Sequence, residues 1–299
     1  SGMLMAARNL GEGMKFVAAL DPEHAELDKK VEAGKKTYAG QELVGRTLGV
    51  VGLGKIGCLV ADAAIKLGMQ VIGYDPEITI DAAWSLPAQV RKASSLSDVL
   101  KNAQFVTLHV PLVDATRLMI SETALQQMKT GSILLNFARD AVVDEVAVLA
   151  ALEAKRIGGY VCDFPSPRLI GHAGVIALPH LGASTREAEE NCASMVAGQL
   201  RDYLLDGNIV NAVNFPAVLM PRESAFRLAI ANANVPNMVG QMSAVMAGAK
   251  LNIHNMMNKS KGEVAYTLVD VDSKVPRKVI DALAGIEGVL AVRYLPTED

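Results

Sequence analysis

The chain has 299 residues, of which 51% are hydrophobic and 20% charged, so it can bury the cores of about two domains. Its net charge of −3 argues against the basic face that nucleic-acid binding requires. No apolar run approaches the ~20 residues of a membrane span, and SGMLMAARNL lacks the pattern of a signal peptide. Cys58, Cys162 and Cys192 show neither CxxC spacing nor a disulfide framework. We therefore expect a cytoplasmic, reduced protein without a metal site.

The first part of the chain predicts a leading helix followed by an alternating α/β pattern. Residues 1–20 look helical, and residues 21–45 are polar enough to be a connection. From Arg46 onward, short apolar runs alternate with longer helical stretches, which indicates crossover units and a parallel sheet buried on both faces. The predicted strands are TLGVVGL, QVIGYD, FVTLHV, SILLNF, GGYVCDF and GVIALP.

The last part of the chain has a different order of elements. Residues 185–206 predict one amphipathic helix, capped by Ser184 or Thr185 and ended by Gly207. A Pro-bounded stretch then gives a boundary near Pro221. Beyond it, the order strand, helix, strand, strand, helix, strand is that of a ferredoxin-like split βαβ domain.

A glycine-rich turn follows the first predicted strand. GLGKIG at 52–57 has the GxGxxG spacing and opens a predicted helix, and the next strand ends at Asp75, about 20 residues later. The first glycine permits the tight turn, the second lets the backbone approach a pyrophosphate, and the third lets helix and strand pack closely. Free N–H groups at the helix start favour phosphate. Asp75 suits ribose hydroxyls and repels a 2′-phosphate, as does nearby Glu77, so the sequence predicts NAD rather than NADP.

Three further segments follow predicted strand ends: HVPL at 109–112 with Thr116 after it, NFAR at 136–139 with VDE after it, and PHLGAST at 179–185. They resemble, in order, the HVPLxxxT, NxARGxxVDE and PHxGxxT segments of D-2-hydroxyacid dehydrogenases, the last in the form typical of the phosphoglycerate dehydrogenases. The resemblance continues through NAVNFP at 211–216 and over the terminal domain, which looks like an ACT domain, the amino-acid-sensing module of those enzymes. It spans nearly the whole chain.

The resemblance implies three regions and a set of site residues. A Rossmann-like doubly wound NAD-binding domain is expected at 1–186, a return segment of the substrate domain at 187–220, and a ferredoxin-like (ACT) α+β regulatory domain at 221–299. His180 is the expected base for the substrate hydroxyl, since imidazole titrates near neutral pH. Arg139 offers the planar fork that matches a carboxylate. The expected cofactor-binding residues are Gly52, Gly54, Lys55, Ile56, Gly57, Asp75, Pro76, His109, Val110, Pro111, Thr116, Ala138, Arg139, Asp163, His180 and Gly182.

The sequence departs from the family pattern beside the catalytic residues. The family pairs its histidine with a glutamate in a DVFxxEP segment, whereas residues 162–167 read CDFPSP and contain no glutamate. Asp163 is the only acid available locally. It either supports His180 or holds the nicotinamide amide, and the sequence leaves this choice open. Asp140, directly after Arg139, either pairs with a cation or is solvated.

The start of the chain is a further departure. Family members begin with a long segment that forms most of the substrate domain, whereas this chain starts within the helix that follows it. The residues that grip the substrate from the opposite wall are therefore expected to be absent, and the chain alone is expected to show little turnover. Truncation, proteolysis and a genuinely short protein remain open. An apolar segment at Met3–Leu10 predicts a homo-oligomer, because exposed apolar helices mark interfaces.

The terminal domain carries a candidate effector site. The family pattern between the first strand and helix is close to HxNxPG, with a further Asn at the start of the next strand. Asn234 and Asn252 match this pattern, while Asn232 replaces the His and Asn237 replaces the Gly. Asn side chains donate and accept, which suits the ammonium and carboxylate of L-serine. A purely structural role is the alternative, because Asn is common in turns.

The leading functional hypothesis is NAD-linked oxidation of 3-phosphoglycerate to 3-phosphohydroxypyruvate, which the resemblance places in serine biosynthesis. The residues by themselves indicate only NAD and a 2-hydroxy acid. Another D-2-hydroxyacid dehydrogenase, of the glyoxylate or hydroxypyruvate reductase type, is a second possibility that the ACT-like domain disfavours. A non-catalytic, NAD-responsive sensor or scaffold is a third, which the presence of both His180 and Arg139 disfavours.

Overall fold

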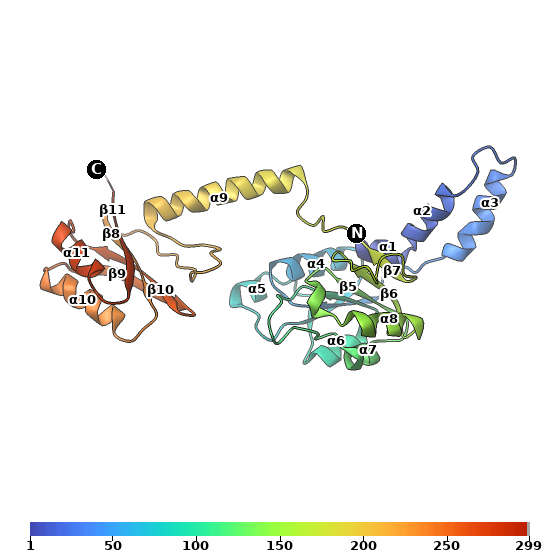
Figure 1. The fold of residues 1–299 in the computed structure, drawn as a ribbon, viewed down its shortest axis with the longest axis horizontal. Helices are drawn as coiled ribbons and strands as arrows, with labels where there is room; N and C mark the ends of the chain where they lie inside the picture. The colour runs from blue at the N-terminus through green and yellow to red at the C-terminus, as the bar shows by residue number, and fades with distance from the viewer. Residues whose placement is uncertain (298–299) are drawn as a thin grey trace. The chain divides into compact units, whose positions relative to one another are not determined.

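The computed structural model describes residues 1–297, except for the side chain of residue 81. The chain divides into two compact units, Ser1–Gly182 and Ala183–Asp299 (Figure 1). Within the described residues, none of the helices combines the length and apolar character that crossing a bilayer requires.

A seven-stranded parallel sheet forms the centre of the first unit, and its strand order is β3-β2-β1-β4-β5-β6-β7. This confirms the predicted doubly wound fold. All six predicted strands are present, and the two-residue strand β3 at the edge was not predicted because it is short and polar. The strands are β1 (Thr47–Val51), β2 (Gln70–Tyr74), β3 (Arg91–Lys92), β4 (Phe105–Leu108), β5 (Ser132–Asn136), β6 (Ile157–Cys162) and β7 (Val175–Ala177).

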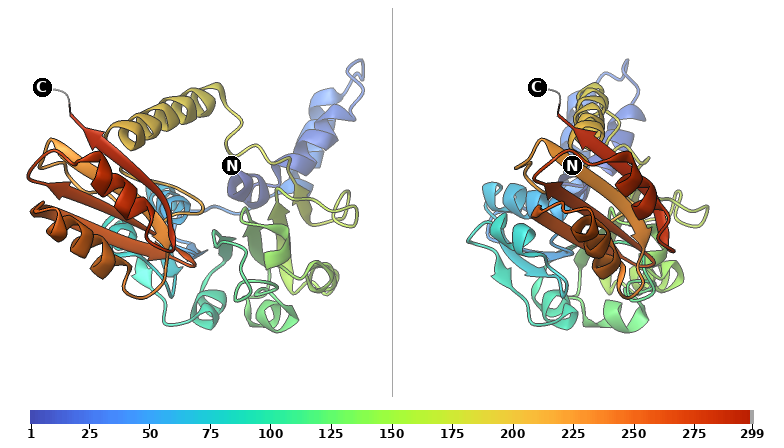
Figure 2. Two further views of the ribbon diagram at one scale, coloured as in Figure 1. Left: turned by 60° about the vertical axis from the view of Figure 1, so that its left-hand side comes forward. Right: turned by 90° about the vertical axis from the view of Figure 1, so that its left-hand side faces the viewer.

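Helices cover both faces of this sheet, and each face has its own apolar core (Figure 2). Alternate strand residues serve the two cores: Val106 and Leu134 belong to one, and Phe105 and Ile133 to the other. This explains the nearly continuous apolar strands. The helices are α4 (Lys55–Lys66), α5 (Ile80–Trp84), α6 (Leu96–Asn102), α7 (Glu122–Gln127), α8 (Glu145–Glu153) and the 3₁₀ turn η2 (Asp140–Val142).

The N-terminal region differs from its prediction. The leading helix is two helices, α1 (Gly2–Ala7) and α2 (Leu10–Ala18), because Asn9 between them adopts the left-handed conformation with φ 49°. The expected connection contains α3 (Leu27–Gly34) and the 3₁₀ turn η1 (Lys35–Tyr38). The oligomer prediction treated Met3–Leu10 as an exposed apolar segment, and this was wrong for part of it, since Met3 and Ala7 pack into one of the two cores of the sheet.

The second unit contains a long helix and a four-stranded antiparallel sheet with strand order β11-β8-β10-β9. The helix α9 (Arg186–Asp206) lies as predicted, with the Thr185 hydroxyl accepting from the Ala188 N–H and Gly207 left-handed at φ 74°. The βαββαβ order is compatible with a ferredoxin-like domain. Its elements are β8 (Phe226–Ala233), α10 (Met238–Gly248), β9 (Ile253–Lys261), β10 (Val264–Val271), α11 (Arg277–Ala284) and β11 (Val289–Pro296).

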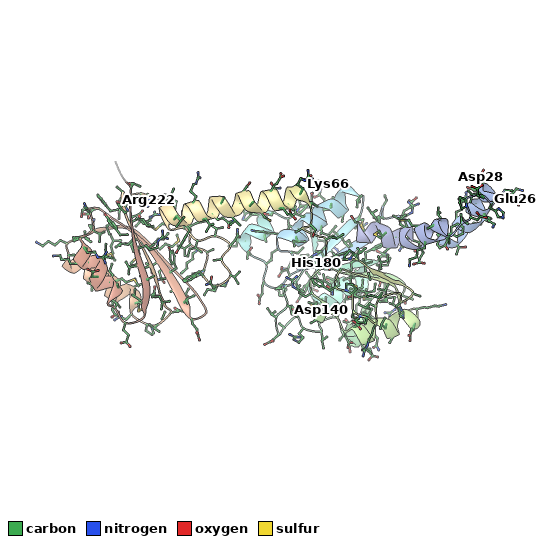
Figure 3. All side chains as sticks on the ribbon, turned by 45° about the horizontal axis from the view of Figure 1, so that its top comes forward. Glu26, Asp28, Lys66, Asp140, His180 and Arg222 are labelled. Carbon is green, nitrogen blue, oxygen red and sulfur yellow. The ribbon has the colours of Figure 1, made fainter. Side chains whose placement is uncertain are left out.

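Three arginines hold the C-terminal end of α9 against this sheet. Arg293 donates to the carbonyls of Tyr203 and Leu204, Arg222 donates to that of Leu205, and Arg227 donates to that of Asp206. Figure 3 shows Arg222 beside this end of the helix. The last carbonyls of a helix lack intrahelical partners and carry the negative end of its dipole. The three guanidinium groups therefore satisfy α9 in both hydrogen bonding and charge.

Candidate active site

The predicted cofactor and catalytic residues lie on loops after the carboxyl ends of strands, except for Lys55, Ile56 and Gly57, which form the first turn of α4. The loops after β1 and β4 meet where the strand order reverses, which is where open α/β sheets bind their ligands. Their approach is close, because a Cβ on Gly52 would lie 2.6 Å from the carbonyl oxygen of His109. The loops after β5, β6 and β7 carry Arg139, Asp163 and His180 along the same edge. Figure 3 shows His180 and Asp140, the neighbour of Arg139, on this unit.

The glycine turn has the geometry that dinucleotide binding needs. Gly52 has φ +90°, which side chains rarely adopt. A Cβ on Gly57 would come within 2.0 Å of the Gly52 carbonyl oxygen, so only glycine lets α4 pack against the turn. A Cβ on Gly54 would meet nothing within 4 Å, so the turn is open on that side, where α4 begins at Lys55 and Ile56. These residues fit a pyrophosphate bound at the helix N-terminus.

Asp75, followed by Pro76, is tied to the same turn. One carboxylate oxygen accepts from the Leu53 N–H at 2.8 Å and the other from the Glu77 N–H at 2.9 Å. Each oxygen of a carboxylate can accept more than one hydrogen bond, so both can still accept from ribose hydroxyls. The two backbone bonds fix the carboxylate in place and keep its negative charge at the predicted ribose position.

The loop after β4 is organised by short local contacts. The Thr116 hydroxyl donates to the Pro111 carbonyl at 2.6 Å and accepts from the Val113 N–H at 2.9 Å, which closes the loop. His109 Nε2 lies 3.0 Å from the hydroxyl of buried Thr107. Burial lowers the pKa of His109 to about 4, so its ring is neutral at physiological pH. His109 can therefore line the predicted cofactor site without adding a charge.

Arg139 is positioned by a buried asparagine. The side chain of Asn136, at the end of β5, accepts from the N–H of Ala138 at 3.1 Å and donates to the carbonyl of Arg139 at 2.9 Å. These two bonds fix the turn from which Arg139 projects. Asn136 belongs to the NFAR motif, but no role was predicted for it. Its position two residues before Ala138, typical of an Asx turn, was the available signal.

His180 and Asp163 form a hydrogen-bonded pair. His180 Nδ1 lies 3.0 Å from Asp163 Oδ2, and the His180 side chain is 57% exposed while that of Asp163 is 8% exposed. An ionised carboxylate only accepts hydrogen bonds, so Nδ1 carries the proton and Nε2 is the basic nitrogen. Of the two contacts that the sequence left open for Asp163, the structure contains the hydrogen bond to His180. The other oxygen of Asp163, Oδ1, is buried without a hydrogen-bond partner within the described residues.

Phe164 lies near both expected catalytic side chains and was not singled out from the sequence. Its ring centroid is 4.5 Å from that of His180, with 36° between the planes. The guanidinium carbon of Arg139 lies 5.8 Å from the same ring centroid. The contact could not be found from sequence because it joins the ends of three strands.

The two cysteines near the site do not extend its chemistry. Burial raises the pKa of Cys162 to about 11, and burial together with Asp75 raises that of Cys58. Both are therefore neutral thiols at physiological pH, and a thiolate is the reactive form. Among the residues that the structure describes, no three His, Cys, Asp or Glu side chains gather in a way that could hold a metal ion.

The candidate effector residues are not gathered within one chain. Asn232 is buried on β8, and its Oδ1 has no hydrogen-bond partner in the described part of the chain. Asn234 follows the same strand and donates to the Gly262 carbonyl at 3.0 Å. Asn252 precedes β9 at the opposite end of the sheet. Strand β10 pairs with Ile253 at that end and with Ala233 at the end where Asn234 lies. That length of strand separates them by on the order of 20 Å.

Known proteins share this fold and much of this sequence. Residues 2–182 match the family model "D-isomer specific 2-hydroxyacid dehydrogenase, NAD binding domain". D-3-phosphoglycerate dehydrogenase of Haemophilus influenzae is 31% identical over 96% of this chain, which spans 71% of that relative. The enzyme of the same name from Escherichia coli K12 is 33% identical over 90% of this chain, which spans 68% of it. Both alignments must reach beyond the first unit, which ends at Gly182.

A solved structure gives the same fold. D-2-hydroxyisocaproate dehydrogenase superposes with a TM-score of 0.58 at 27% identity, covering 70% of this chain and 64% of its own. The chain thus spans less than two thirds of that structure.

Proposed function

The chain belongs to the D-isomer-specific 2-hydroxyacid dehydrogenase family, and we propose that the protein oxidises 3-phosphoglycerate to 3-phosphohydroxypyruvate with NAD. The observation that carries the proposed chemistry is the His180–Asp163 pair at the strand ends of an NAD-binding domain. The choice of substrate is supported by similarity to two D-3-phosphoglycerate dehydrogenases over 90% or more of the chain. On this proposal the reaction supplies serine biosynthesis.

His180 acts as the general base. Asp163 accepts a hydrogen bond from Nδ1–H, so Nε2 keeps its lone pair and takes the proton of the substrate hydroxyl. The imidazolium that forms keeps its hydrogen bond to the Asp163 carboxylate, and the bond strengthens as charge develops. Because Asp163 is buried, this bond acts in a medium that screens it less than water does.

Arg139 binds the carboxylate of the substrate and polarises the carbonyl that develops at C2. Its planar fork gives two parallel hydrogen bonds to a carboxylate. NAD, when bound, supplies the carbon that accepts the hydride. The buried, unpartnered Oδ1 of Asp163 is a ready acceptor for an amide N–H at the nicotinamide end. One aspartate would then serve both the base and the cofactor, which the family divides between two acids.

The direct test is turnover by the full-length gene product, which is called the intact protein below. We expect NADH to form from 3-phosphoglycerate and NAD, and the reverse reaction to run with 3-phosphohydroxypyruvate. Glyoxylate and hydroxypyruvate serve as comparison substrates. A higher kcat/KM for either of these would support the reductase alternative instead. NADH binding without turnover of any 2-hydroxy acid would leave only the sensor or scaffold.

The charge of Asp75 is expected to select NAD over NADP. In the isolated chain, calorimetry should give tighter binding of NADH than of NADPH, because the fixed carboxylate repels a 2′-phosphate. Asp75→Asn keeps the side-chain size and can still accept from the Leu53 N–H, so it should narrow this preference without disrupting the turn. Glu77→Gln is the control for a nearby charge that is not tied to the turn. Preference of the parent chain for NADPH would contradict the role of Asp75.

We also propose that the second unit is an ACT-like regulatory domain that binds L-serine between two copies of the chain. Asn232 and Asn234 lie at one end of the sheet, and the buried Oδ1 of Asn232 lacks a hydrogen-bond partner among the described residues. An ammonium group would satisfy that oxygen. Asn252 lies too far away to share the ligand within one chain, so it would reach the site from a second copy.

L-Serine at millimolar concentration is therefore expected to raise the melting temperature of the protein, because a ligand that binds only the folded state stabilises it. Asn234→Ala should abolish the shift. D-Serine and Asn255→Ala, which changes a mid-strand asparagine of the same sheet, are the controls. The structural role alone would remain if serine gave neither heat of binding nor a thermal shift.

We further propose that two copies of the protein form a homodimer. Leu4 and Leu10 are 40% and 46% exposed, and on α2 Met14 and Val17 are 71% and 56% exposed. These side chains form an apolar surface on α1 and α2 that a second copy would cover.

A further inference from the structure

We propose that Phe164 is a positioning residue that fixes the imidazole plane of His180 and holds Arg139 beside it. The proposal rests on the proposed dehydrogenase function and deepens it. No glutamate follows CDF at 162–164, and the Phe164 ring lies near both the base and the cation.

The His180–Asp163 bond alone does not define the position of the ring. A single N–H···O contact holds one nitrogen in place, but the ring can still pivot about that bond and swing Nε2 across the cleft. His180 is more than half exposed, so few other neighbours restrain it. Phe164 meets the ring on its face, at 4.5 Å between centroids, while Asp163 meets it at its edge. A contact at the edge and a contact on the face together fix both direction and plane.

Phe164 also relates His180 to Arg139. During the proposed reaction His180 becomes a cation beside a permanent cation, and the two would repel each other. The face of an aromatic ring carries negative partial charge and attracts cations within about 6 Å. The Arg139 guanidinium carbon lies 5.8 Å from the centroid of the Phe164 ring. The ring thus lies within range of Arg139 and stacks against the imidazole that becomes the second cation.

The two side chains that contact His180 come from adjacent residues of the chain. Asp163 and Phe164 are adjacent in the bend that directly follows β6. One reaches the edge of the imidazole and the other its face. Two adjacent residues after β6 thereby position His180, one through a hydrogen bond and the other through a ring contact. The family segment uses a separate glutamate instead.

Two variants distinguish the effect of the aromatic face of Phe164 from the effect of its apolar volume. Phe164→Leu removes the aromatic face and keeps an apolar side chain, and Phe164→Tyr keeps the face. In the intact protein we expect Phe164→Leu to lower kcat for the 2-hydroxy acid by on the order of 10²-fold, the effect of misplacing a reacting group by about 1 Å. Phe164→Tyr should retain most of the parent kcat. NADH affinity should stay at the parent value in both, which also shows that the NAD-binding unit is folded.

A spectroscopic measurement on this chain tests the contact without turnover. Stacking on Phe164 should shift the His180 ring-proton resonances upfield in NMR spectra, assigned by comparison with His180→Gln. The shift should vanish in Phe164→Leu and persist in Phe164→Tyr. Phe215→Leu is the matched control, because it removes a ring that packs on Tyr266 in the other unit. It should change neither kcat nor the His180 resonances.

The outcomes are distinguishable from failure of the proposed function. If the parent protein turns over no 2-hydroxy acid, the dehydrogenase proposal fails, and unshifted His180 resonances in the parent chain would overturn the stacking as well. If the parent is active and Phe164→Leu keeps both its kcat and its His180 resonances, Phe164 is not a positioning residue. Equal loss of kcat in the Leu and Tyr variants would also overturn the role of the aromatic face.

Discussion

His180→Ala is expected to lower kcat for 3-phosphoglycerate oxidation by about 10²–10⁴-fold, the usual contribution of general acid–base catalysis. The variant lacks the nitrogen that removes the hydroxyl proton. The glycine turn and Asp75, which carry the proposed adenosine and pyrophosphate contacts, lie on other loops and are unchanged. NADH should therefore still bind. Steady-state rates measured by NADH absorbance, together with NADH titration by fluorescence, give the two quantities separately.

Two variants frame this result. His24→Ala removes a histidine from a loop between α2 and α3, where its Nδ1 accepts from the Glu26 N–H, and should leave kcat unchanged. Asp163→Asn should lower kcat in the same direction as His180→Ala, because an amide can present its N–H₂ group to Nδ1 and no longer selects the tautomer. Near-normal turnover by His180→Ala would falsify its assignment as the base.

The fold could be predicted from the sequence because its signals are local and periodic. Each buried parallel strand is a nearly continuous apolar run, and the switch to a βαββαβ order after Pro221 is equally plain. Elements without such a signal were missed. Strand β3 has only two residues, and α3, within LDKKVEAG, is short and polar with no buried residue. The break between α1 and α2 depends on the left-handed backbone of Asn9, which is a property of one residue.

The candidate site could be predicted only as far as its motifs extend. Motifs give the residues at each strand end, and parallel strands bring their carboxyl ends to one edge, so His180 and Arg139 could be placed together. The partner of His180 could not be chosen, because that depends on a distance of 3.0 Å between two loops. The separation of Asn252 from Asn234 follows from strand register in the second unit, which neither side chain reveals.

The second large effect concerns stability of the C-terminal unit. Arg227 and Asp270 form a salt bridge with both side chains 0% exposed, and Arg227 Nε and Nη2 donate to the two carboxylate oxygens at 2.6 and 2.8 Å. Arg227→Ala leaves a buried carboxylate without its counter-charge, which costs about 3–5 kcal/mol. It also leaves the carbonyls of Asp206 and Met220 without this donor. A typical domain has only about 5–15 kcal/mol of stability, so a large share would be lost.

Hydrogen exchange resolves where that loss falls. In Arg227→Ala the amides of β8 and β10 should exchange much faster, while those of β1 and β4 in the other unit should keep their rates, because local stability governs protection. The matched control is Arg277→Ala, which breaks an ion pair with Asp281 in the same unit whose side chains are 83% and 58% exposed. Exposed pairs contribute about 0–1 kcal/mol, so this variant should exchange almost like the parent.

Arg227→Met combined with Asp270→Leu should recover part of the lost stability, because it removes both buried charges. The recovery should be incomplete, because the α9 carbonyls still lack their donors. Equal exchange in Arg227→Ala and Arg277→Ala would mean that the buried pair does not stabilise the C-terminal unit.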